Sequence, residues 1–277
     1  MLSESTLSAK FRHFRRYAHS LYHGHRQREL FNGVSCYCMF LGYPRSGHSL
    51  VGALINAHKH AVIAHELNAL WFVEQGFNRN QLFDLLLRRD QRFTDNGSTW
   101  REYDYKVPNQ WQGRFESLAV IGDKKGGMSS DMLEERPELL RKLRACVGVP
   151  LRLIHVVRNP FDNISTMSTR SGNSLQKSIK KYFALCESVN AVIAQLDRSE
   201  IFTLRYDDLI AQPEPQLEAT CDFLGLEREP SYLADCASII FKSPTNTRHK
   251  VEWPDHLRAK AQASMAAYEF LQGYAFD

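Results

Sequence analysis

One glycine-containing segment has the residue types and spacing of a phosphate-binding loop. Residues 42–49 read Gly-Tyr-Pro-Arg-Ser-Gly-His-Ser, which is the spacing G-x-x-x-x-G-x-S. In such a loop the backbone N–H groups and the N-terminus of the following helix point at an anion. An apolar run precedes the segment and a helix-forming run follows it, so strand, loop and helix come in the required order. We predict a phosphate site here; a tight turn without a ligand is the alternative.

The loop lacks a cation that nucleotide triphosphatases use. In those enzymes a lysine stands directly before the final Ser or Thr and reaches the β- and γ-phosphates. His48 occupies that position here, and the long cation is Arg45. The loop therefore favours a phosphate ligand without a Mg-bound triphosphate tail. Its expected contacts are Arg45, Ser46, Gly47, His48 and Ser49.

A cation and two hydroxyl side chains follow the apolar run 151–157. Arg158 ends this run, and Ser165 and Thr166 follow it on the next predicted helix. A guanidinium fork suits a terminal phosphate, and a hydroxyl near a helix start adds a donor. A surface arginine at a strand end is the alternative.

The elements that would position these residues alternate along the chain. Apolar runs predict a helix over 50–58 and strands over 34–41, 61–64, 118–122, 151–157 and 201–205. Apolar runs without polar alternation, separated by helices, indicate a parallel sheet covered on both faces. An aromatic-rich insertion, 67–117, follows the second strand. We predict one α/β domain over residues 1–277, a P-loop-like parallel sheet with helices on both faces.

The N-terminal stretch 1–30 carries a basic amphipathic pattern over 4–30. Its apolar residues recur at helical spacing among several arginines; they are Leu7, Phe11, Phe14, Ala18 and Leu21. A membrane-surface or targeting helix is one interpretation. We favour the other, a helix packed on the domain with a solvated basic side, because the apolar face is only moderately strong.

Composition restricts the class of protein. The 277 residues carry 35 Lys and Arg against 31 Asp and Glu, a net charge of +4 that is too small to indicate a nucleic-acid partner but allows an anionic small molecule. The chain has no apolar run long enough for a membrane span and no signal-peptide pattern. Its six cysteines include no C-x-x-C pair, so we expect no zinc site and a reduced, cytoplasmic protein.

Together the motifs resemble the sulfotransferases that use 3′-phosphoadenosine 5′-phosphosulfate (PAPS). Residues 43–47 resemble the 5′-phosphosulfate loop of that family, and Arg158 with the hydroxyl eight positions later resembles its 3′-phosphate site. Residues 204–209 resemble its R-Y-E-D-L segment, with the matching residues 223–226 after it. The stretch 42–66 is most similar to bacterial and tyrosylprotein sulfotransferases.

The resemblance implies a donor, a set of contacts and a class of acceptor. PAPS would supply a sulfuryl group to a hydroxyl or amine of a small molecule, a sugar or a peptide, without a metal. Tyr206 would lie against the adenine, and the basic residues Arg248 and Lys250 would close over the 3′-phosphate, although their register differs from the R-K-G of the cytosolic enzymes. The resemblance does not extend to the insertion 67–117, which we separately expect to bind the acceptor.

The resemblance also implies the catalytic groups. Arg45 and Lys124 would stabilise the departing phosphate; Lys124 follows the third strand, where ligands bind in open parallel sheets, and Lys125 is its rival. Tyrosylprotein sulfotransferases use a glutamate after the second strand as the base, and Glu66 matches its spacing from the loop. His65 is the rival base, although neighbours on an extended chain face apart. A helix cap is the structural alternative for Glu66, and a solvated pair for the lysines.

Two other functions remain open at this point. One is an ATP-dependent small-molecule kinase, which would need the missing loop lysine and a Mg-holding aspartate at a strand end. The other is a protein that binds 3′-phosphoadenosine 5′-phosphate (PAP) without catalysing transfer.

Overall fold

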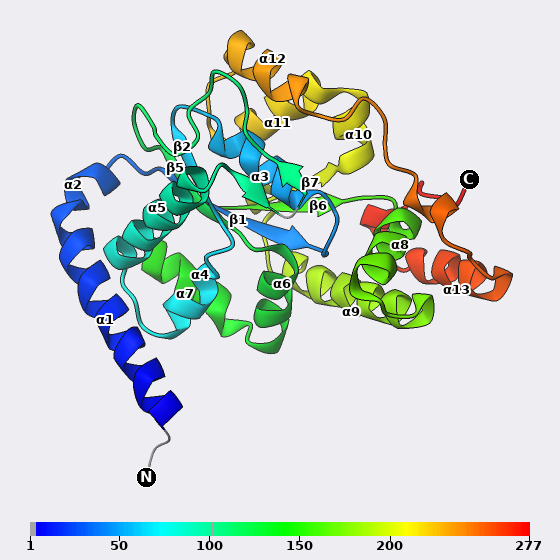
Figure 1. Cartoon of the computed structure of the whole chain (residues 1–277), viewed down its shortest axis with the longest axis horizontal. Coiled ribbons are helices and arrows are strands. Elements are labelled where there is room, and N and C mark those ends of the chain that lie inside the picture. Colours follow the sequence, from blue (N-terminus) through cyan, green and yellow to red (C-terminus); the bar gives the residue numbers. More distant parts are fainter. Residues whose placement is uncertain (1–3, 101) are drawn as a thin grey trace.

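A central parallel sheet organises the chain in the computed structural model, which describes residues 4–100 and 102–277, the first nine of these through their backbone alone. Its five strands lie in the order β2-β5-β1-β6-β7 (Figure 1). Their bounds are β1 Cys36–Gly42, β2 Ala61–His65, β5 Val120–Lys124, β6 Leu151–Val157 and β7 Ile201–Arg205. Every pairing is parallel, so all five carboxyl ends meet at one edge.

Two apolar clusters cover the two faces of the sheet. On one face Cys38 and Phe40 of β1 pack with α3 (His48–Asn56), α10 (Tyr206–Ala211), α11 (Pro213–Leu224) and α12 (Pro230–Ser238). On the other face Met39 and Leu41 of the same strand pack with a second set of helices. That set is α4 (Ala69–Glu74), α5 (Arg79–Asp95), α6 (Gly126–Glu135), α7 (Glu138–Val147), α8 (Pro160–Ser171), α9 (Leu175–Ile193) and α13 (Asp255–Met265). β1 is buried along its whole length because both of its faces are covered.

The predicted fold class is confirmed: this is a single α/β domain with a parallel sheet and helices on both faces. The strands at 151–157 and 201–205 have the predicted bounds. The strand predicted at 118–122 begins two residues later, because its ladder starts where Val120 pairs with Cys36 and Ala61. As a result Lys124 is the last residue of β5 and does not lie beyond it.

The aromatic residues of segment 67–117 divide into core and surface. Phe72 of α4 and Phe83 of α5 are buried in the apolar cluster that contains Met39 and Leu41 of β1. A short antiparallel hairpin, β3 (Thr99–Trp100) with β4 (Tyr103–Asp104), carries aromatic side chains that are partly exposed. The acceptor-binding role of this segment stays a prediction.

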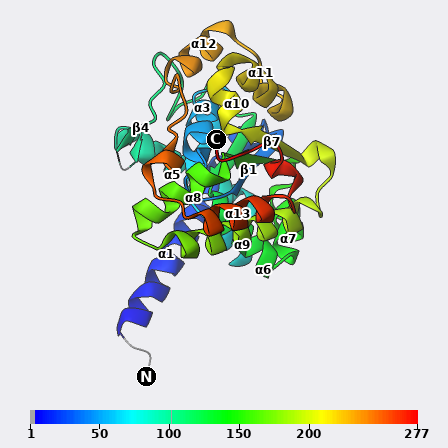
Figure 2. The ribbon, with the colours of Figure 1, turned by 90° about the vertical axis from the view of Figure 1, so that its right-hand side faces the viewer.

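The N-terminal residues form the long helix α1 (Glu4–Arg26), and a short helix α2 (Arg28–Phe31) follows. α1 packs along α5, and its N-terminal half extends beyond the rest of the molecule in both views (Figures 1 and 2). The helix predicted over 4–30 is therefore broken at Gln27, and the side chains of Leu7 and Phe11 lie outside the described residues. No described helix is long and apolar enough to cross a membrane. The remaining short elements are the 3₁₀ turns η1 (Arg198–Glu200), η2 (Thr247–Lys250) and η3 (Glu269–Leu271).

Candidate functional site

The candidate phosphate-binding loop at residues 42–49, which we call the phosphate-type loop, joins β1 to the N-terminus of α3 and needs glycine at its turn. Gly47 has φ +98°, and a Cβ atom placed on it would lie 2.3 Å from the ring of Tyr206. Arg45, with φ +73°, also adopts the left-handed conformation that is uncommon for residues with a side chain. The close contact brings Tyr206, from the segment after β7, directly against the loop.

Polar side chains from neighbouring elements hold the loop in place. The Tyr43 hydroxyl lies 3.1 Å from Nε2 of His155 on β6, and Nδ2 of Asn163 on α8 donates to the Pro44 carbonyl. Ser46 is buried, and its Oγ lies 3.2 Å from Nδ1 of His48. Burial, helped by the charge of Lys124, lowers the pKa of His48 to about 3. His48 is therefore neutral at pH 7 and does not replace the lysine of a nucleotide triphosphatase.

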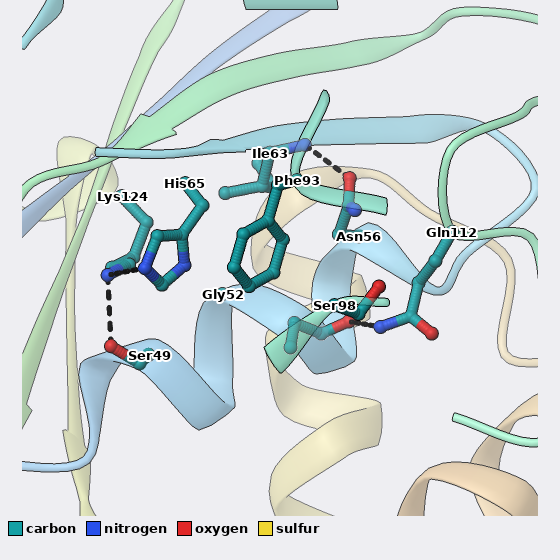
Figure 3. A pocket seen from close by; sticks show the side chains of 10 residues that line it. Ser49, Gly52, Asn56, Ile63, His65, Phe93, Ser98, Gln112 and Lys124 are labelled. Carbon is teal, nitrogen blue, oxygen red and sulfur yellow. Dashed lines mark hydrogen bonds between the residues drawn. The ribbon is translucent and has the colours of Figure 1, made fainter. Parts of the chain in front are cut away.

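Lys124 is the centre of the polar contacts at the carboxyl edge of the sheet. Its Nζ donates to Ser49 Oγ at 2.9 Å and lies 3.4 Å from His65 Nε2 (Figure 3). It also donates to Glu66 Oε1 at 3.1 Å. The side chain is buried, so the alternative of a solvated lysine pair is wrong for Lys124. Burial lowers its pKa to about 8, although the carboxylate of Glu66 opposes this shift. Lys124 therefore links the phosphate-type loop to the candidate base.

Glu66 leaves β2 in the left-handed conformation, with φ +58°. This turn directs its carboxylate toward two cations, because Oε2 also accepts from Lys125 at 3.2 Å. Our expectation that His65 and Glu66 face apart is wrong, since both side chains contact Lys124; the residues are not both on extended chain. Glu66 is also not a helix cap, because the N-cap of α4 is Asn68.

The charge state of Glu66 follows from its neighbours. Burial acts to raise the pKa of the carboxyl, but the charges of Lys124 and Lys125 outweigh this effect and hold the pKa at about 2. Glu66 is therefore ionised at neutral pH. The backbone that carries it is held by Asp123, whose two carboxylate oxygens accept from the N–H groups of Leu67 at 2.9 Å and Ala69 at 2.8 Å.

His65 is enclosed by aromatic rings. Its imidazole stacks on Phe93, with centroids 4.1 Å apart (Figure 3). The centroid of the Trp100 ring lies 5.0 Å from that of His65. Burial and the charge of Lys124 lower its pKa to about 3, so His65 is neutral. The cavity behind Lys124 has a volume of about 10 Å³, on the order of one water molecule. A substrate must therefore reach Lys124 from the side of the loop and Glu66.

Arg158 forms a second polar cluster where β6 ends. Its Nη1 lies 3.5 Å from Thr166 Oγ1, and its Nη2 donates to the carbonyl of Thr245 at 2.6 Å. The structure therefore brings Arg158 and Thr166 together, as their spacing predicted. Ser165 differs, because its hydroxyl is fully buried and accepts from Trp253 Nε1 at 2.8 Å. Among the predicted hydroxyls of α8, Thr166 is thus the one beside Arg158.

The basic residues of the C-terminal loop separate in the structure. The Arg248 guanidinium pairs with the buried carboxylate of Asp162 at 2.6 Å and also donates to the Phe276 carbonyl. Its contacts fix the turn η2 on α8, an arrangement in which Arg248 acts as an anchor. Lys250 is exposed. The same turn contributes Thr247, whose hydroxyl lies 3.0 Å from that of Thr166.

Sequence reasoning missed three residues of these clusters. Thr245 and Thr247 follow no helix-forming or strand-forming run, so their place beside Arg158 depends entirely on the tertiary fold. Asp123 is next to Lys124 in the sequence, but no sequence pattern predicts its hydrogen bonds to the backbone that follows β2. The described residues contain no group of three or more His, Cys, Asp or Glu side chains that could hold a metal ion.

Comparisons with known proteins show the family of the chain. A family model described as the sulfotransferase family matches residues 39–230, so the chain belongs to that family. No curated protein matches it in sequence. The solved structures similar to it include the sulfotransferase domain of the curacin biosynthetic pathway, which is 16% identical with a TM-score of 0.51 over 85% of this chain and 99% of that one.

Two other solved structures show the same fold. The sulfotransferase domain of the Synechococcus PCC 7002 olefin synthase is 16% identical, with a TM-score of 0.52 over 86% of this chain and 96% of that domain. A Mycobacterium avium sulfotransferase is 9% identical, with a TM-score of 0.50 over 90% of this chain and 81% of that one. The family match and the shared fold identify the chain as a sulfotransferase.

Proposed function

We propose that this sulfotransferase takes its sulfuryl group from PAPS and transfers it to a hydroxyl or amine. The observation that carries the proposal is the contact of Lys124 with both Ser49 of the phosphate-type loop and Glu66 after β2. One cation thus joins an anion site to a carboxylate that can accept a proton. Transfer from a phosphate donor to an acceptor needs these two functions side by side.

The residues present fit such a nucleotide. The loop and the N-terminus of α3 offer backbone N–H groups for the 5′-phosphate end, and Arg158 with Thr166 offers a fork and a hydroxyl for a 3′-phosphate. The ring of Tyr206 lies between them, against Gly47 and with the Arg158 guanidinium 6.0 Å from its centroid. We assign Tyr206 to the base of the nucleotide. Lys250 remains a candidate for closing over the 3′-phosphate, whereas Arg248 would act by holding η2 in place.

The chain's own groups support an in-line transfer. PAPS supplies a neutral SO₃ unit and leaves negative charge on its phosphate oxygen. We assign Lys124 and Arg45 to the stabilisation of this charge, and each well-placed donor of this kind is worth about 3 kcal/mol in the transition state. Glu66 accepts the acceptor's proton. Its basicity rises as Lys124 turns toward the departing phosphate, because the charge that holds the pKa of Glu66 at about 2 is then shared.

A kinase on the same architecture is less well supported. That reaction would need an aspartate at a strand end to hold Mg²⁺. Asp123 is at the end of β5, but both of its oxygens accept from backbone N–H groups and it is buried. Sulfotransfer activity should accordingly survive EDTA, and loss on chelation with recovery in Mg²⁺ would favour the kinase.

The acceptor can be found by untargeted mass spectrometry. Cell extract incubated with the protein and PAPS should yield products that gain SO₃, and extract incubated with PAPS alone should not. The exposed aromatics of the β3–β4 hairpin, Trp100 and Tyr103, suit a sugar, a phenol or an aromatic peptide side chain. Binding of PAP with no product from any acceptor would instead support the non-catalytic alternative. Cytoplasmic localisation stays a prediction from the sequence.

A further inference from the structure

The outward side of α1 carries two parallel stripes of exposed residues. Successive steps of four, three and four residues place Phe14, Ala18, Leu21 and His25 on one stripe. The same steps place Arg15, His19, Tyr22 and Arg26 on the adjacent stripe. We call these eight residues the outer face of α1.

The opposite side of α1 is fixed to the domain. Tyr17 packs edge-on against Phe77, and Gln81 of α5 donates to the Tyr17 carbonyl and to Ser20 Oγ. The helices approach so closely that a Cβ on Gly24 would lie 2.5 Å from the carbonyl oxygen of Asn80. The outer face is therefore held at a set orientation and is not turned inward by a small rotation of the helix.

The apolar part of the outer face is unusually exposed. Phe14 is 67% exposed, Tyr22 59% and Leu21 45%, and Leu30 of α2 is exposed nearby. Half of the large apolar side chains that are exposed in the described part of the chain lie on α1 and α2. Exposed apolar side chains that gather on one face mark an interaction surface, whereas isolated ones do not.

Charge on this helix points to an anionic partner. Residues 5–28 contain six Lys and Arg, four His and no Asp or Glu, which leaves 29 Lys and Arg against 31 Asp and Glu in the remaining chain. The positive excess of the whole protein thus comes from α1 and its junction with α2. A helix with an apolar stripe beside a basic stripe lies in the headgroup region of an anionic bilayer, where apolar side chains enter the boundary and arginines meet lipid phosphates.

The sequence alone favoured a merely solvated basic side; because of the exposed apolar side chains we instead propose that the outer face of α1 binds the surface of an anionic membrane, with the helix axis parallel to the bilayer. A second copy of the chain fits this face less well, because pairing two such faces would bring like charges together. A nucleic acid would use the arginines but would leave Phe14 and Leu21 in water. Membrane binding by this face is independent of the sulfotransfer reaction, so its test needs no acceptor and no nucleotide.

The test is co-sedimentation of the full chain with vesicles of phosphatidylcholine alone and of phosphatidylcholine mixed with phosphatidylserine. We expect binding to the mixed vesicles that weakens with added salt. Phe14→Ser with Leu21→Ser should weaken it about tenfold or more, and so should Arg15→Glu with Arg26→Glu. These side chains are exposed, and unchanged circular dichroism would confirm that each variant folds.

Matched controls lie elsewhere on the surface. Phe241→Ser removes an exposed aromatic beyond α12, and Arg141→Glu with Lys142→Glu reverses two exposed charges on α7. Both controls should bind vesicles like the unaltered protein. The proposal is overturned by three results: no binding to the mixed vesicles at low salt, equal loss in the controls, or binding that survives Phe14→Ser with Leu21→Ser. In the last case binding would depend on charge alone, as it does for a nucleic acid. A second copy of the chain would be the partner instead if the protein binds no vesicles but forms dimers in sedimentation velocity, and if these substitutions dissociate the dimers.

Discussion

Glu66 and Lys124 define the chemistry of the site at the scale of single residues. The ion pair keeps Glu66 ionised and Lys124 charged at neutral pH. In Glu66→Gln the proposed proton acceptor is lost while the shape of the side chain is kept, so kcat should fall by about 10²- to 10⁴-fold. PAP affinity should change little, because we assign Glu66 to the acceptor and not to the nucleotide. Glu74→Gln, on nearby α4, is the control and should keep its rate; near-full turnover of Glu66→Gln would remove Glu66 from the mechanism.

The buried lysine also predicts a pH dependence. Burial lowers the pKa of Lys124 to about 8, so its charge is present below that pH and is lost above it. A step that needs this charge should slow as the pH rises through about 8, visible in kcat/KM measured from about pH 6 to pH 10. Lys124→Arg should remove this alkaline fall, at a lower overall rate, because arginine stays charged. An unchanged profile in Lys124→Arg would assign the titration to another group.

At the scale of elements, the phosphate-type loop depends on its second glycine. Gly47→Ala would place a methyl group 2.3 Å from Tyr206 at φ +98°, so both the turn and the tyrosine must move. We expect a loss of about 1–3 kcal/mol in the free energy of unfolding and no thermal stabilisation by PAP. Gly148→Ala is the matched control, since Gly148 also has a positive φ of +64° but has open space around it. Gly148→Ala should lose only the free energy that the positive φ costs an alanine, and PAP should still raise its melting temperature.

The elements also show how far the sequence predicts this site. The apolar runs at 151–157 and 201–205 are continuous, so the sequence predicts where both strands end. It therefore also predicts that Arg158 and Tyr206 lie at those strand ends. The left-handed turn at Glu66 was not predictable from the sequence. It depends on hydrogen bonds from the backbone N–H groups of Leu67 and Ala69 to Asp123, which lies on the distant strand β5. The pairing of Arg248 with Asp162 joins residues far apart in the chain, and local patterns carry no information about such a contact.

At the scale of the whole molecule, the proposed nucleotide contacts join the end of β6 to α8 and the segment before η2, and they should stabilise the fold when they are occupied. A ligand at one hundred times its Kd adds about 2.7 kcal/mol to the free energy of unfolding. PAP should therefore raise the melting temperature well above AMP or ATP at equal concentration. Arg158→Ala should weaken PAP by about 2 kcal/mol or more, because a charge-assisted contact is lost. Arg152→Ala, on β6, should leave the PAP shift intact; equal shifts with PAP and AMP would refute the 3′-phosphate site.

The position of β1 in the middle of the sheet has a consequence for how the chain is made. β1 is the first strand to be synthesised, yet both of its neighbours, β5 and β6, come much later; the contact from Ser35 to Ala119 alone spans 84 residues. At the usual pace of translation this is a delay on the order of ten seconds. During that time an apolar strand has two unpaired edges, which attract other chains. A nascent protein of this topology therefore needs protection on the ribosome, and a fragment that ends before β5 should aggregate when released.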